Sequence, residues 1–343
     1  MNATDIVCTV GPMSSRSYIL REMRLAGMTS VRVNMAHASA RDLLYFASRV
    51  RAITPRIKVL ADLPGPKIRI GDIQPRKIAP GMQVSFTTEQ HPHLGRIPVG
   101  FAGFPSCVSP GEVLHTDDGR TALEVKEVQG NEVHCEVLFG EWLLPRKGIN
   151  CPGEEDFDPI TAEDEALIPQ LKAAEPQYVA ASFVQSAEGV LAVRRALDGA
   201  GMPADVLAKI ETPHGVEHIR EIVECDATAG VIVARGDLAY EAERAELLHN
   251  ALRVILEAKR AGKLVIMATQ MLDSMVRERV PTRAEIFDVS LAVALGCDGV
   301  MTSNETAEGS NPVETVKVMR EIVSAAEGRR EELRSLMQEI FAL

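Results

Sequence analysis

Eight short apolar runs constrain the fold of this chain more than any other feature. Each run is rich in Val and Ile and is followed by polar or Gly/Pro residues and then by a helical pattern. Apolar strands of this kind form parallel sheets that helices cover on the outside. Eight of them predict an α/β fold, a (β/α)8 TIM barrel, in preference to a doubly wound sheet. The runs are residues 6–10, 30–35, 57–62, 178–183, 206–210, 230–234, 264–269 and 299–303.

One interval breaks the spacing of these runs, because the third ends at residue 62 and the fourth begins at 178. Residues 71–147 carry Gly/Pro turns and three alternating patches, which are typical of a small β domain. We therefore predict an inserted β-barrel lid domain over 71–147 and a catalytic barrel over 1–70 and 148–343. The barrel part has about the length of a typical single barrel, roughly 250 residues.

The composition narrows the choice of partners. The chain has 48 acidic against 37 basic residues and a net charge of −11, which argues against nucleic acid and anionic membranes as partners. No apolar stretch approaches the roughly 20 residues of a membrane helix, and no signal-peptide core begins the chain, so we expect a cytoplasmic protein. The six cysteines are scattered without a C-x-x-C pair, which predicts reduced thiols.

Polar residues collect where the active site of such a barrel lies, at the carboxyl ends of its strands. A single acidic residue at a strand end is more often a helix cap or a structural ion pair, but here several strand ends carry charged groups together. Two carboxylates from adjacent strands suit one Mg²⁺, and surrounding Arg and Lys side chains suit a phosphoryl group. The strand-end residues are Arg32, Asn34, His37, Asp62, Lys67, Arg69, Lys209, Glu211, Arg235, Asp237, Thr269, Ser303 and Glu305.

Most of these residues lie within motifs that resemble the pyruvate kinase family over nearly the whole chain. The resemblance implies transfer of a phosphoryl group from phosphoenolpyruvate to a nucleoside diphosphate, with ADP as the expected acceptor and pyruvate and ATP as products. It also implies Mg²⁺ as the cofactor, with Mn²⁺ able to replace it. The motifs that carry the resemblance are 6–12, 31–37, 146–153, 208–211, 233–238, 268–272, 281–285 and 303–307.

The resemblance also implies roles at matching positions. Lys209 would neutralise the migrating phosphoryl group, Arg32 and Arg69 would bind phosphates, and Glu211 with Asp237 would hold Mg²⁺. The groups that would hold phosphoenolpyruvate belong to Ala234, Arg235, Gly236, Asp237 and Thr269. The route that protonates the enolate would comprise Thr269, Ser303 and Glu305. The nucleotide would contact Asn34, His37 and Lys147.

Several positions depart from the family pattern. At the monovalent-cation site the family commonly has Ser, Thr and Glu, whereas this chain has Ala36, Leu63 and Lys67. We expect the Lys67 ammonium to substitute for the cation, so that K⁺ is not required. The chain ends before the family's usual C-terminal effector domain, so we do not expect allosteric control of the usual kind. Asn304, Ala239 and Pro64 also replace residues that are common in the family. They could reshape the site.

Three readings of the function remain. A Mg²⁺-dependent pyruvate-enolate lyase or aldolase could use the same barrel and metal ligands, and a non-catalytic relative is a further alternative. Lys209, Arg69 and Lys147 together favour the kinase, because a lyase has no charge migrating between phosphates. The sequence does not decide whether the protein serves glycolysis or a dedicated biosynthetic or salvage pathway. It also leaves open the base preference, any effector and the oligomeric state. A homo-oligomer would use barrel helices or the tail helix predicted over 329–340, whose apolar residues are Leu333, Leu336, Met337, Ile340 and Phe341.

Overall fold

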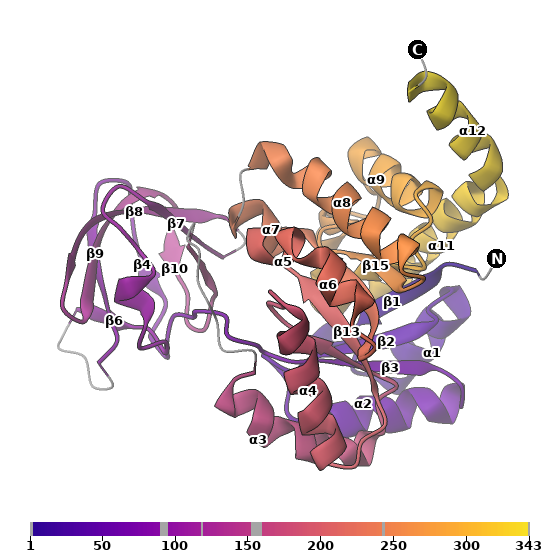
Figure 1. Cartoon of the computed structure of the whole chain (residues 1–343), viewed down its shortest axis with the longest axis horizontal. Helices are drawn as coiled ribbons and strands as arrows, with labels where there is room; N and C mark the ends of the chain where they lie inside the picture. The colour runs from indigo at the N-terminus through magenta and orange to yellow at the C-terminus, as the bar shows by residue number, and fades with distance from the viewer. Residues whose placement is uncertain (1–2, 90–94, 118, 152–159, 242–243, 342–343) are drawn as a thin grey trace.

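Eight parallel strands close into a barrel whose order around the ring follows the chain, as the sequence predicts. The computed structural model describes residues 3–341 except 90–94, 118, 152–159 and 242–243 (Figure 1). Every predicted run overlaps one strand, and the bounds agree within two residues. The strands are β1 (Asp5–Thr9), β2 (Ser30–Asn34), β3 (Lys58–Asp62), β12 (Tyr178–Ala181), β13 (Asp205–Ile210), β14 (Thr228–Ala234), β15 (Leu264–Ala268) and β16 (Gly299–Thr302).

Helices cover the outside of the barrel, and several begin at a side-chain cap. The side chains of Ser39 and Thr282 each accept a hydrogen bond from the backbone N–H of the third helical residue. The carboxylate of that third residue in turn accepts a hydrogen bond from the backbone N–H of the capping residue. The long helices are α1 (Ser17–Ala26), α2 (Ala40–Ile53), α3 (Ala162–Leu171), α4 (Ala187–Gly199), α8 (Leu247–Arg260), α9 (Arg283–Ala294), α11 (Pro312–Gly328) and α12 (Arg330–Phe341). The short ones are α5 (Pro213–Glu217), α6 (Ile219–Glu224), α7 (Arg235–Glu241) and α10 (Asn304–Ala307).

Two helical predictions need correction. The helical pattern of residues 214–224 predicts one helix. The structure instead divides this segment into α5 and α6 at His218, whose ψ of 13° lies outside the helical range. The tail helix α12 exists, but it packs against the barrel less than its spacing suggests. Leu336 and Ile340 are exposed, and Leu333 is only half-buried. The side chain of Phe341 lies outside the described residues.

The barrel buries apolar side chains in two layers. The inner layer fills the ring itself and includes Leu60, Leu207, Ile232 and Met301, so the barrel is a packed core and not a pore. The outer layer lies between the strands and the helices. This packing fixes the strand ends, and therefore the side chains that follow them. None of the described helices is long and apolar enough to cross a membrane.

The inserted segment forms a separate β domain that stands beside one end of the barrel (Figure 1). It consists of a curled six-stranded sheet and a two-stranded ribbon, and it has its own apolar core around Phe86 and Phe104. We call this domain the lid. Its strands are β4 (Arg76–Lys77), β5 (Gln83–Thr87), β6 (Arg96–Pro98), β7 (Val113–Thr116), β8 (Thr121–Gln129), β9 (Glu132–Phe139), β10 (Trp142–Leu143) and β11 (Ile149–Asn150).

Candidate active site

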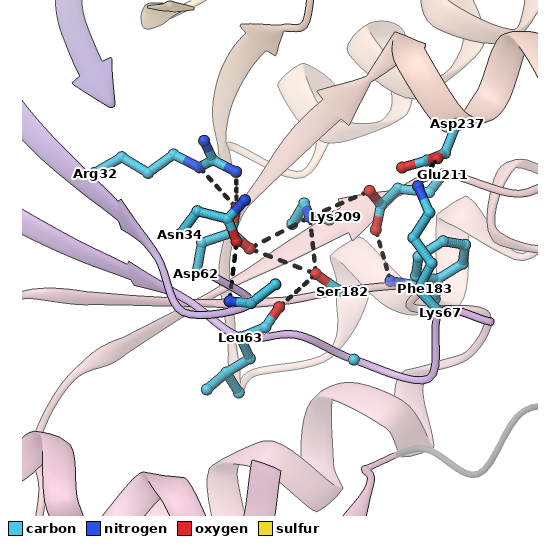
Figure 2. Close-up of polar contacts among 12 residues, drawn as sticks. Arg32, Asn34, Asp62, Leu63, Lys67, Ser182, Phe183, Lys209, Glu211 and Asp237 are labelled. Carbon is cyan, nitrogen blue, oxygen red and sulfur yellow. Dashed lines mark hydrogen bonds and ion pairs between the residues drawn. The ribbon is translucent and has the colours of Figure 1, made fainter. Parts of the chain in front are cut away.

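Lys209 lies at the centre of a buried polar cluster at the carboxyl end of the barrel (Figure 2). Its Nζ is 2.8 Å from Ser182 Oγ, 3.3 Å from Asp62 Oδ1 and 3.2 Å from Glu211 Oε1. Burial alone would lower the pKa of Lys209, but the two carboxylates raise it above its ordinary value. The side chain therefore carries a positive charge at neutral pH.

Asp62 joins Lys209 to a second cation, Arg32. Arg32 Nη2 lies 2.5 Å and its Nε 2.7 Å from Asp62 Oδ2, and Arg32 Nη1 donates to Thr9 Oγ1 at 2.7 Å. Burial would raise the pKa of Asp62, but Lys209 and Arg32 hold it below its ordinary value. Asp62 therefore stays ionised and fixes both cations at the mouth of the barrel.

Ser182 follows β12 directly and is a cluster member that the sequence reading missed. Its hydroxyl donates to the Leu63 carbonyl oxygen at 2.8 Å and accepts from Lys209. The sequence feature that could have identified Ser182 is its position, because it is a polar residue within the fourth apolar run. A lone serine among apolar residues is too common to single out without the fold.

Glu211 and Asp237 bring two carboxylates close together from neighbouring strands. Glu211, after β13, accepts a hydrogen bond from the backbone N–H of Phe183 at 2.8 Å. Burial raises the pKa of Glu211, and the Asp237 carboxylate adds to the rise although Lys209 opposes it. Burial would also raise the pKa of Asp237, but the Lys67 ammonium and a hydrogen bond from Asn150 hold it well below its ordinary value.

These two carboxylates fit a divalent cation. They are hard oxygen donors, and a small ion such as Mg²⁺ takes one or two protein carboxylates and leaves positions for substrate oxygens. Burial, and then the nearby Asp237 carboxylate, raise the pKa of Glu211, and a bound cation would offset both effects. The contacts of Asp237 with Lys67 and Asn150 both fall on Oδ1. Among the described residues no hydrogen bond or ion pair falls on Asp237 Oδ2.

Lys67 enters the cluster from the loop after β3 and forms an ion pair with Asp237 (Figure 2). Its Nζ also lies 5.9 Å from the centre of the Phe183 ring. Leu63 is buried and offers no side-chain oxygen. The side-chain oxygen of Asn34 accepts a hydrogen bond from the Ala36 backbone at 3.2 Å. The structure therefore places the Lys67 ammonium against the Asp237 carboxylate. Its substitution for a monovalent cation stays a prediction.

The side chain of Arg235 does not face this cluster. Its guanidinium lies 2.6 Å from Asp288 on α9 and donates to the carbonyl oxygens of Ala268 and Thr269. Only the backbone of Arg235 is left to contact a substrate. Its side chain instead fixes the turn at Thr269, whose φ of +72° is rare for a β-branched residue. A Cβ at Gly236 would lie 2.6 Å from Thr269 Cγ2, so this approach requires glycine.

Glu305 is buried and connects the loops that follow β15 and β16. Its carboxylate accepts hydrogen bonds from the backbone N–H groups of Leu272 at 3.1 Å and Ser303 at 2.6 Å. Burial raises the pKa of Glu305 above its ordinary value. The contacts described for Ser303 are made by its backbone. The proton route through Thr269, Ser303 and Glu305 therefore stays a prediction.

The remaining predicted residues, His37, Arg69 and Lys147, lie near enough to one another to interact electrostatically. Lys147 Nζ lies 2.7 Å from Asp117 Oδ1. Partial burial, Arg69 and Lys147 lower the pKa of His37, so this imidazole is neutral at pH 7. Burial also lowers the pKa of Arg69, and its guanidinium forms no ion pair within the described part of the chain. Arg69 is thus a cation available for an anionic ligand.

The fold and this cluster define an enzyme of the (β/α)8-barrel class in which cations and carboxylates meet beneath an inserted β domain. The family model described as "Pyruvate kinase, barrel domain" matches residues 1–316. The chain belongs to the pyruvate kinase family, and it is a pyruvate kinase-like phosphotransferase.

Curated relatives support this assignment. The chain is 37% identical to the pyruvate kinase of Thermococcus litoralis over 338 residues, which cover 96% of this chain and 71% of the relative. It is 36% identical to the Aeropyrum pernix pyruvate kinase, with 94% of this chain and 70% of the relative covered. Pyruvate kinase II of Salmonella typhimurium is 36% identical, with 95% and 70% covered.

Proposed function

We propose that this protein transfers a phosphoryl group from phosphoenolpyruvate to a nucleoside diphosphate, with ADP as the acceptor, and releases pyruvate and ATP. The observation that carries the proposal is the largely buried, protonated Lys209 among Asp62, Ser182 and Glu211. Phosphoryl transfer is catalysed mainly by positioning and by neutralising charge, and a fixed ammonium at the barrel mouth supplies both. The curated relatives carry the same activity in their names.

The other residues take roles that agree with their positions. Arg69 and Arg32 would bind phosphate oxygens, since Arg69 is free of ion pairs among the described residues and Asp62 orients Arg32. Glu211 and Asp237 would hold Mg²⁺ or Mn²⁺, which neutralises phosphate charge when bound. Asn34, His37 and Lys147 would contact the nucleotide, His37 as a neutral imidazole.

The substrate's carboxylate and methylene ends would lie against the β14–α7 turn and the β15 loop. The backbone of Ala234 to Asp237 and the Thr269 hydroxyl would position them, while Thr269, Ser303 and Glu305 would supply the proton for the enolate carbon. The proposal divides the chain into a catalytic barrel (1–70 and 148–343) and a lid (71–147), and β11 at the start of the returning segment completes the lid sheet. Closure of the lid would exclude water that could intercept the phosphoryl group.

The proposed reaction does not require K⁺. A monovalent cation beside the phosphoryl group would supply one positive charge held by side-chain oxygens, but Ala36 and Leu63 offer none. The Lys67 ammonium, paired with Asp237, supplies the same charge from within the chain. A tethered cation also avoids the entropy lost when a free ion is captured.

The test is a coupled assay with phosphoenolpyruvate, Mg²⁺ and a panel of nucleoside diphosphates in tetramethylammonium buffer, with and without K⁺. We expect pyruvate formation that depends on the diphosphate, is highest with ADP and changes less than about twofold with K⁺. Lys67→Glu should lose most activity without K⁺ and regain part of it with K⁺. Pyruvate release that is independent of any diphosphate would overturn the kinase and favour a lyase. Strong K⁺ activation of the unmodified protein would overturn the role of Lys67.

A further inference from the structure

Asn150 lies where the last strand of the lid returns to the barrel, and it contacts the candidate metal site directly. Its side-chain Nδ2 donates to Asp237 Oδ1 at 2.9 Å and to Glu241 Oε1 at 2.7 Å. The residue is only 4% exposed. An amide group has two N–H donors, so both of them are used on carboxylates here and the orientation of the amide is fixed.

The two carboxylates that Asn150 joins lie one turn apart on α7. Asp237 and Glu241 are separated by four residues, a spacing at which like charges on a helix repel each other. The Asn150 amide donates one N–H hydrogen bond to each of these carboxylates. Together with Lys67, it also holds Asp237 by Oδ1, which leaves Oδ2 as the oxygen that can turn toward a cation. Asn150 therefore sets the rotamer of a proposed metal ligand.

The same residue belongs to the lid. β11 pairs with β7, and Asn150 lies opposite His115 in that register. The ring of His115 in turn contacts Tyr240 on α7, with 5.1 Å between ring centres. A Cβ at Gly119, in the turn after β7, would collide with the Tyr240 ring. Asp237, Tyr240 and Glu241 thus place the metal ligand and the lid contacts on one short helix.

We propose that Asn150 is a positioning residue for the divalent-cation site, and that it couples this site to the lid through α7. The inference rests on the proposed function, because it requires Glu211 and Asp237 to bind the cation. A residue that orients a metal ligand typically contributes 10- to 100-fold to metal affinity. Metal binding should in turn restrain the β11 return strand, because coupling between two sites is reciprocal.

The first experiment measures binding of Mn²⁺ alone from the electron paramagnetic resonance signal of the free ion. We expect the unmodified chain to bind one Mn²⁺ ion and Asp237→Asn to abolish this binding. Asn150→Ala should weaken Mn²⁺ binding about 10- to 100-fold. Asn150→Ser, which keeps one donor, should show an intermediate loss and serves as the second variant if the alanine protein does not fold. Asn131→Ala, at an exposed lid turn, is the matched control and should bind Mn²⁺ normally.

The second experiment follows backbone hydrogen exchange at β11 and β7. Saturating Mn²⁺ should slow exchange there in the unmodified chain and in Asn131→Ala but not in Asn150→Ala, a readout that a merely structural role would not move. Unchanged Mn²⁺ affinity in a folded Asn150 variant would overturn the inference and leave the proposed function standing. If Asp237→Asn binds Mn²⁺ as well as the unmodified chain does, the proposed metal site itself is wrong.

Discussion

The barrel mouth and the lid use charge in opposite ways. At the mouth, the side chains of Asp62 and Lys209 are only 1% and 14% exposed, and they form one connected network with their neighbours. In the lid, ion pairs lie nearer the surface, and the Arg146–Asp72 pair has about three quarters of each side chain open to solvent. The lid is held together instead by its own apolar core.

From this contrast we expect the barrel mouth to carry out the chemical step and the lid to supply the domain motion. Exposed pairs contribute about 0–1 kcal/mol each, whereas removing one partner of a buried pair costs roughly 3–5 kcal/mol. The buried network therefore cannot rearrange at low cost, whereas the separate apolar core of the lid would let that domain move as a unit. Substitutions in the barrel should change the chemical step, and substitutions at the contact with the lid should change closure.

The largest expected effect comes from Lys209→Met. We predict that kcat for phosphoryl transfer falls by at least 10²–10³-fold, since one preorganised charge contributes about that much. The rate of enolpyruvate protonation, measured by tritium exchange into pyruvate, should fall less than the rate of phosphoryl transfer. The barrel should stay folded because Asp62 keeps its pair with Arg32.

Lys126→Met provides the matched control, because Lys126 pairs with Glu124 on the lid surface. It should leave both reactions unchanged. Circular dichroism of both variants checks the fold. Transfer at the unmodified rate in Lys209→Met would show that the central cation does not act on the phosphoryl group.

The second prediction concerns the pH dependence of metal stabilisation. Because the folded-state pKa of Glu211 is raised, ionising this carboxylate costs stability, and the cost appears as pH rises above its unfolded pKa of about 4.3. Mn²⁺ should offset this cost, adding about 2.7 kcal/mol at 100 times its Kd, and should raise the melting temperature more at pH 8 than at pH 5. Scanning calorimetry at the two pH values measures the difference.

Glu211→Gln sharpens that measurement. Without metal it should melt higher than the unmodified chain at pH 8, because a buried ionised carboxylate next to Asp237 is gone. Mn²⁺ should add little to its stability. The Asn131→Ala protein is again the control. An equal metal-induced increase in Glu211→Gln would place the cation elsewhere.

A third, smaller effect is expected at the contact between lid and barrel. Gly119 has a φ of +74° and lies against Tyr240, so Gly119→Ala introduces backbone strain and a collision. We expect kcat/KM for the nucleotide to fall roughly 3- to 10-fold with little change in barrel stability. Tyr240→Ala alone and the Gly119→Ala/Tyr240→Ala double variant complete a double-mutant cycle. The double variant should recover part of the kcat/KM lost in Gly119→Ala. Strict additivity would mean that the two residues do not interact during closure.

The sequence predicted the barrel well because strand runs and helix caps are local signals. All eight strands and the β domain were found, since periodicity and turn residues specify them. The contacts that join distant segments were not accessible in this way. The orientation of Arg235 depends on Asp288 in a later helix, and the role inferred for Asn150 depends on Glu241 across the boundary with the lid. Such pairs become visible only when the fold places them together.

The smallest effect is expected from the tail helix. α12 contacts the barrel through Arg334, which donates to the Ala294 carbonyl oxygen, and through Arg330, which donates to Thr4 Oγ1. Its Leu336 and Ile340 are exposed. Deletion of residues 329–343 should therefore lower the melting temperature by only a few degrees, equivalent to about 1 kcal/mol, and leave kcat unchanged.

Any self-association should survive this deletion. α8 carries Leu248, Leu252 and Leu256 at four-residue spacing, all exposed, and Phe287 on α9 is 70% exposed. This is a larger apolar surface than α12 presents, so the barrel helices are the stronger candidates for contact between copies. Light scattering should give the same mass for the deleted and full chains, and a lower mass for Leu252→Glu if the chain associates. A lower mass after the deletion alone would assign the contact to α12.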